Sequence, residues 1–127
     1  MKEDYVNFEI AKLLKEKGFD WECLNWYSTK GNLYHYADSF EIDLDGITEL
    51  CSAPTLQMAM KWLREKGIII SISYVRRNLQ TIGSQMVFEF KIQNADGELL
   101  FTTTEFTFEF YEAAAEYAIK YCLTNLI

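Results

Sequence analysis

"IIISISYVRRNLQTIGSQMVFEFKIQNADGELLFTTTEFTFEF", residues 68–110, decides the fold class of this chain. Apolar and polar residues alternate in three successive runs of this stretch, and a period of two is typical of half-buried β-strands. Asp96–Gly97, between the second and third runs, is a strong signal for a tight hairpin turn. Strands joined by tight turns are antiparallel, so the stretch predicts a three-strand antiparallel meander.

The alternation also predicts which side chains of the meander face the core. The positions expected to point inward are Ile68, Ile70, Ile72, Tyr74, Met86, Phe88, Phe90, Ile92, Phe106, Phe108 and Phe110. Val87, Glu89 and Lys91 are expected on the opposite face. The meander therefore has one apolar face, which helices are expected to cover.

Helical patterns flank the meander on both sides. Helices are predicted in DYVNFEIAKLLKEKG (4–18), PTLQMAMKWLREKG (54–67) and YEAAAEYAIKYCLTNLI (111–127). FDWECLNWYS (19–28) and NLYHYADSFEI (32–42) predict a hairpin with its turn at Gly31–Asn32, and DLDGITELCSAP (43–54) is expected to be a connector. The predicted fold class is α+β, with an antiparallel sheet (the C-terminal three-strand meander plus the N-terminal hairpin) covered on one face by about three helices. The chain length favours a single domain over residues 1–127.

Composition narrows the classes of function. The net charge is −7, and residues 18–53 hold seven acidic residues against one basic residue, Lys30. Such a charge repels a phosphate backbone, so we expect no nucleic-acid partner. No apolar run reaches the roughly 18 residues that a membrane helix needs, and the first residues lack the pattern of a signal peptide. We expect a cytoplasmic protein without a membrane partner.

Residues 21–40, WECLNWYSTKGNLYHYADSF, concentrate aromatic side chains next to this acidic charge. Such rings either fill a small core, anchor a protein partner or stack on a flat ligand. The sequence supports a binding surface of Trp21, Trp26, Tyr34 and Tyr36, with Asp43 and Asp45 as its electrostatic rim. The function expected is that of a small accessory protein that presents an acidic, aromatic surface to a protein partner.

Two alternatives stay open beside this hypothesis. The first is a small-molecule-binding or hydrolytic domain with a pocket between sheet and helices, anchored by His35, Arg76 or Arg77. The second is a homo-oligomer that forms along an exposed strand edge.

Residues that would support catalysis or metal binding are sparse in the sequence. Cys23, Cys51 and Cys122 form no tight pair with each other or with His35, so we expect buried, reduced thiols and no metal. Phosphate-binding glycine motifs and hydrolase motifs are also absent. We therefore assign no catalytic residue and no cofactor, and an enzyme is the less favoured class.

Two further stretches, APTLQMAMKWLREKGI (53–68) and FYEAAAEYAIKYCLTNLI (110–127), carry a resemblance. They resemble a group of small, functionally uncharacterised proteins carried by prophages and other mobile elements of gut anaerobes. The resemblance implies an intracellular, prophage-type setting. It implies no activity and no site residues.

Overall fold

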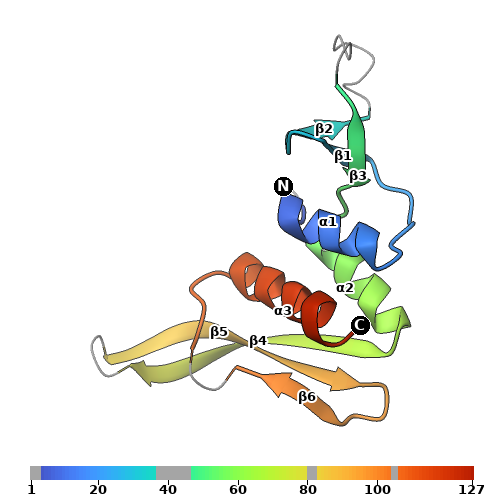
Figure 1. Cartoon of the computed structure of the whole chain (residues 1–127). Coiled ribbons are helices and arrows are strands. Elements are labelled where there is room, and N and C mark those ends of the chain that lie inside the picture. The colour runs from blue at the N-terminus through green and yellow to red at the C-terminus, as the bar shows by residue number, and fades with distance from the viewer. Residues whose placement is uncertain (1–3, 37–46, 80–82, 104–105) are drawn as a thin grey trace.

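A computed structural model describes residues 4–36, 47–79, 83–103 and 106–127 of the chain (Figure 1). Within these residues the elements follow in the order α1 (Phe8–Glu16), β1 (Asn25–Ser28), β2 (Leu33–His35), β3 (Glu49–Ser52), α2 (Leu56–Glu65), β4 (Ile68–Leu79), β5 (Gly83–Asn94), β6 (Leu99–Thr102) and α3 (Tyr111–Asn125). All strand pairs are antiparallel. The predicted α+β class is confirmed.

The strands form two separate sheets, which the sequence did not predict. The small sheet has the order β2-β1-β3 and the large sheet the order β4-β5-β6. The three helices lie between the two sheets, and α3 rests on the large one (Figure 1). The small sheet includes β3, which lies in a stretch expected to be a connector. β3 pairs with β1 on the side opposite β2, so it completes a three-strand sheet together with the predicted N-terminal hairpin.

The small sheet is built around β1. Gly31 takes a φ of +86°, as the predicted turn requires, and its N–H donates to the carbonyl of Ser28 at 2.9 Å. Tyr27 points toward the helices, where its hydroxyl donates to the carbonyl oxygen of Val6 at 2.7 Å. Neighbouring residues of a strand face opposite ways, so Trp26 and its partner Tyr34 lie on the other face.

In the large sheet, β4 and β5 pair continuously from Ile68–Asn94 to Leu79–Gly83. The third strand is shorter than the alternation suggests: β6 ends at Thr102, and among the described residues after it the chain pairs with β5 at one isolated bridge, between Phe88 and Phe108. The β4–β5 hairpin extends past the N-terminal end of α3, where no helix lies above it (Figure 1).

This geometry corrects three of the positions predicted to face the core. Tyr74 is 59% exposed because it lies on the part of the hairpin that runs past α3. Phe110 is 64% exposed at the start of α3, and Phe106 is exposed as well. Phe90 and Ile92, which lie deeper along β5, are buried as predicted.

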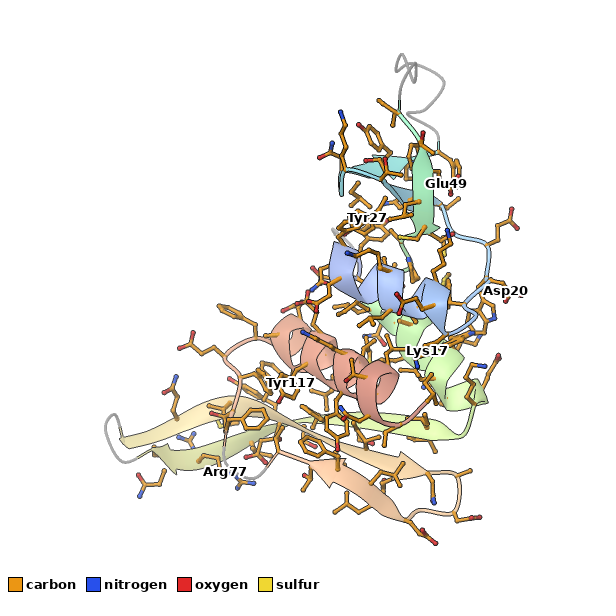
Figure 2. The ribbon with its side chains drawn as sticks, viewed as in Figure 1. Lys17, Asp20, Tyr27, Glu49, Arg77 and Tyr117 are labelled. Carbon is orange, nitrogen blue, oxygen red and sulfur yellow. The ribbon has the colours of Figure 1, made fainter. Side chains whose placement is uncertain are left out.

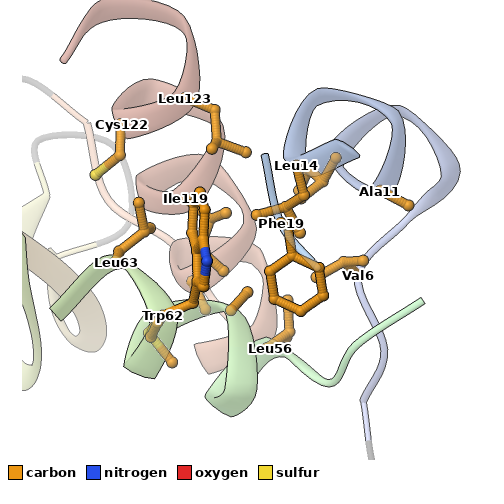
Figure 3. Close-up of a cluster of buried hydrophobic side chains, with 14 of the residues drawn as sticks. Val6, Ala11, Leu14, Phe19, Leu56, Trp62, Leu63, Ile119, Cys122 and Leu123 are labelled. Atoms are coloured by element: carbon orange, nitrogen blue, oxygen red, sulfur yellow. The ribbon is translucent and has the colours of Figure 1, made fainter. Parts of the chain in front are cut away.

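One apolar core joins the helices to both sheets. Figure 3 shows the part of this core that lies among the helices. Its fully buried side chains include Val6, Ile10, Leu14, Leu63, Phe90, Ile92, Ile119 and Leu123. α2 lies within the helix predicted over 54–67, and its apolar residues Leu56, Ala59, Met60 and Leu63 are all buried. No helix in the part of the chain that the structure describes is long and apolar enough to cross a membrane.

Candidate functional site

The aromatic residues predicted as a binding surface occupy different depths. Trp26 is only 3% exposed, and its ring stacks on Tyr34 with centroids 4.7 Å apart and an interplanar angle of 24°. Tyr36 packs on the same indole at 6.2 Å and is 40% exposed. The buried indole of Trp26 therefore packs beneath the rings of Tyr34 and Tyr36. Because Tyr36 is the exposed ring of the three, a partner that docks on this surface contacts Tyr36.

Trp21 and Tyr36 come together in an open cleft of about 560 Å³. The residues that line this cleft are Asp20, Trp21, Glu22, Cys23, Leu24, Tyr36 and Ser52. We call it the acidic cleft. Leu24 adds a large apolar group, since it is 69% exposed. The half-buried indole of Trp21 packs on Phe19 at 6.0 Å, and Phe19 in turn packs on Trp62 of α2 at 5.5 Å.

The electrostatics of the cleft are set by carboxylates around Tyr36. The hydroxyl of Tyr36 donates to Glu49 Oε1 at 2.6 Å. This hydrogen bond, with smaller contributions from burial and from the charges of Glu49, Cys23 and Glu22, raises the pKa of Tyr36 to about 12. The phenol is therefore neutral at physiological pH, and two carboxylates act on the same end of the cleft.

A second hollow of about 340 Å³ is lined by Glu49, among other residues, and shares Ser52 with the acidic cleft. It contains Lys15, whose ammonium group donates to the carbonyl oxygen of Leu50. The basic group next to the cleft is thus bound to the backbone, and it lines the second hollow only.

Asp43 and Asp45, the predicted rim, lie outside the described residues. The acidic residues that the structure does place at the cleft are Asp20, Glu22 and, through its hydrogen bond with Tyr36, Glu49. Figure 2 shows Asp20 in the segment between α1 and the small sheet, and Glu49 on β3. The excess of acidic residues in 18–53 was the only sequence signal for these three.

The alternative polar anchors do not line the acidic cleft. Arg77 lies on the hairpin at the far end of the molecule (Figure 2), where its Nη2 donates to Glu89 Oε1 at 2.7 Å. Arg76 donates to the hydroxyl of Ser84 at 3.3 Å. His35 lies on β2 opposite Asn25. These three residues are on two different sheets and do not converge.

The cysteines are placed for packing. All three are buried and unpaired, and burial raises the pKa of each thiol, that of Cys122 to about 12. A thiol with a raised pKa is a weak nucleophile at neutral pH. Within the described ranges, no three His, Cys, Asp or Glu side chains gather closely enough to hold a metal ion.

A second aromatic surface was missed in the sequence because Tyr74, Phe88 and Phe106 were expected to point inward. Phe106 and Tyr117 pack at 5.0 Å, and Tyr74 packs on Phe88 at 4.7 Å. These rings lie where the hairpin passes the first turns of α3 (Figure 2, which labels Tyr117).

No family model, curated protein or solved structure matches the chain. The resemblance to prophage-borne proteins stays a prediction. The geometry and charge of the acidic cleft are therefore the basis for a functional proposal.

Proposed function

We propose that the protein is a small accessory protein that presents an acidic, aromatic surface to a protein partner. The observation that carries the proposal is the acidic cleft, in which Trp21 and Tyr36 lie beside Asp20 and Glu22. Trp and Tyr are the residues that most often dominate the binding energy of protein interfaces.

The rings of the cleft are already ordered before a partner binds. Trp21 is backed by Phe19, and Tyr36 is fixed by its hydrogen bond to Glu49 and by contact with Trp26. Because binding need not immobilise these side chains, less conformational entropy is lost than for freely rotating rings. Pre-ordered aromatic groups next to exposed Leu24 are the arrangement expected of an interface.

Charge indicates a basic partner. The chain has a net charge of −7, and the carboxylates at the cleft belong to its most acidic segment. A negative patch accelerates association with a positive surface and disfavours nucleic acid. We place the protein in the cytoplasm in this proposal, because unpaired buried thiols are usual in reducing compartments.

A pull-down with purified, folded variants tests the proposal. Trp21→Ala and Tyr36→Ala are expected to lose the partner that the wild type retains, because each removes one wall of the cleft. Tyr74→Ala is the matched control, since it removes an exposed ring on the other sheet. Equal recovery of the partner by all three folded variants would contradict docking at the cleft.

A small-molecule-binding role is the second candidate. The observation in its favour is the volume of the cleft, about 560 Å³, which falls within the range of about 300–1,000 Å³ of ligand sites. The cleft lies beside the small sheet and not between the large sheet and the helices, where the sequence analysis expected a pocket. A metabolite library screened by the shift in melting temperature tests this role; a shift lost in Trp21→Ala would support it.

Self-association is supported by a separate feature, the outer edge of β4. This strand runs over 12 residues and, in the part of the chain described, pairs only with β5. A long unpaired edge is a template for pairing with a second copy. Light scattering that gives the monomer mass at high protein concentration would exclude it.

A further inference from the structure

The acidic cleft combines two features that together select one class of ligand group. Two aromatic residues, Trp21 and Tyr36, line it together with two acidic residues, Asp20 and Glu22. We infer that the cleft binds the guanidinium group of an arginine side chain on the partner. The inference rests on the proposed function and names the chemistry that the partner brings to it.

The aromatic rings of Trp21 and Tyr36 favour a cation as the ligand. The π-electron face of Trp, and less so of Tyr, attracts a cation held within about 6 Å of its centre. Arg is the cation found there most often, since its planar guanidinium is weakly hydrated and stacks on a ring. The stacked pair of Trp26 and Tyr34 behind Tyr36 holds the Tyr36 ring in place for such a contact.

The two acidic residues of the cleft, Asp20 and Glu22, have no basic partner among the described residues. Among the described residues that line the cleft, none is Lys, Arg or His. Neither Asp20 nor Glu22 forms an ion pair with a described residue. A guanidinium offers five N–H donors in a fixed plane, so it can stack on a ring while its edge bonds a carboxylate. An anionic group would be repelled at the same place.

The raised pKa of Tyr36 agrees with this assignment. Part of the shift comes from the charges of Glu49 and Glu22, so both carboxylates are sensed at the Tyr36 hydroxyl. Lys15, the neighbouring basic group, does not cancel them inside the cleft, because it is bound to the Leu50 carbonyl in the adjoining hollow.

The test uses two capped amino acids that differ only in charge. N-acetyl-arginine methylamide and its neutral analogue, N-acetyl-citrulline methylamide, are titrated into the ¹⁵N-labelled full chain. The indole N–H signal of Trp21 reports the cleft, and that of buried Trp62 is the internal control. We expect the arginine probe to shift the Trp21 signal with a millimolar Kd, at least about fivefold tighter than citrulline. Added salt is expected to weaken the binding.

A variant then tests the contribution of the negative charge to binding. Glu22→Gln keeps the shape of the side chain and removes its charge, so we expect a roughly two- to fivefold weaker Kd for the arginine probe. Glu98→Gln, an exposed acid in the turn before β6, is the matched control and is expected to change nothing. Both variants must give the wild-type pattern of amide signals away from the substitution.

Each outcome decides the inference separately from the proposed function. Selective binding of the arginine probe that Glu22→Gln weakens supports it. Equal binding of arginine and citrulline would overturn the choice of a cation and leave docking at the cleft standing. If neither probe moves the Trp21 signal, the guanidinium site is overturned, and the pull-down with Trp21→Ala decides the proposed function independently.

Discussion

At the scale of single residues, the hydrogen bond between Tyr36 and Glu49 has a measurable pH dependence. The pKa of Tyr36 is about 12 in the folded chain, against about 10 for an unfolded tyrosine. The folded state thus holds this proton more tightly. Its contribution to stability is complete below pH 10 and is lost as the pH rises through about 12. We expect Tyr36→Phe to cost about 0.5–1 kcal/mol at pH 8, a modest value because the pair is exposed to solvent.

Urea unfolding of the wild type and Tyr36→Phe at pH 8 and pH 11 provides the measurement. The difference in unfolding free energy between the two proteins should shrink at pH 11. Glu49→Gln keeps an acceptor without the charge, so the pKa of Tyr36 should return toward 10 in that variant. If the difference in unfolding free energy is the same at pH 8 and pH 11, the hydrogen bond to Glu49 does not raise the pKa of Tyr36 in solution.

Cys122 gives a second prediction for a single side chain. Burial raises the pKa of its thiol to about 12, so almost no thiolate exists at pH 8. We expect Cys122 to react with a disulfide reagent such as DTNB only after the chain opens. The measurement is the number of thiols released quickly in buffer and in urea, with mass spectrometry to locate the label. Rapid labelling of Cys122 in buffer would mean that α3 leaves the core far more often than its full burial suggests.

At the scale of elements, the sequence predicts best where a pattern is long. The stripe from Leu56 to Leu63 extends over two turns, and its helix was predicted close to its bounds. β3 is only four residues long, and the single buried side chain Cys51 gives no period to detect. Alternation correctly grouped Tyr74 with Phe90 on one face. It carries no information on how far α3 extends over that face, so the exposure of Tyr74 was not predictable.

The N-terminus of α3 offers a prediction at this scale. Phe110 is the N-cap residue, with extended backbone angles of φ −123° and ψ 141°, and no side chain caps the helix there. In α2, by contrast, the hydroxyl of Thr55 accepts from the Met58 N–H at 3.1 Å. We expect Phe110→Ser to stabilise the protein by about 0.5–1 kcal/mol, because it supplies the missing acceptor.

Chemical denaturation measures this change, and Thr55→Ala is the matched control that removes a cap. That variant should cost about 1 kcal/mol. Destabilisation by Phe110→Ser would indicate that the exposed phenyl ring contributes packing that outweighs a cap.

At the scale of the whole molecule, the acidic cleft was not visible in the sequence because it is assembled from distant segments. Asp20–Leu24, Tyr36 and Ser52 line it, and Ser52 belongs to the strand that sequence patterns did not reveal. The aromatic residues were found because they are dense along the chain. Which of them reach solvent depends on the pairing of β1 with both neighbours, which buries Trp26 and leaves Tyr36 at the edge.

The core between the two sheets predicts how the molecule unfolds. α3 contacts β4, β5, α1 and α2, and α1 contacts β3, so a continuous set of packed elements connects the large sheet to the small one. Leu123 is fully buried in this shared core. We therefore expect Leu123→Ala to cost about 2–5 kcal/mol and to destabilise both sheets equally. Leu99→Ala, which truncates an exposed leucine at the start of β6, should change stability by less than about 0.5 kcal/mol.

Urea titration followed by amide NMR signals of β1 and β5 distinguishes one cooperative unit from two. If the shared core couples the sheets, both sets of signals disappear at one midpoint, and Leu123→Ala moves that midpoint by the same amount for each. Loss of the β5 signals at lower urea, with β1 unaffected by the substitution, would mean that the small sheet and its cleft fold as a separate unit. Because Phe19 and Trp62 back Trp21 from the helical side, coupling is the expected result: the cleft keeps its shape only while α2 is packed.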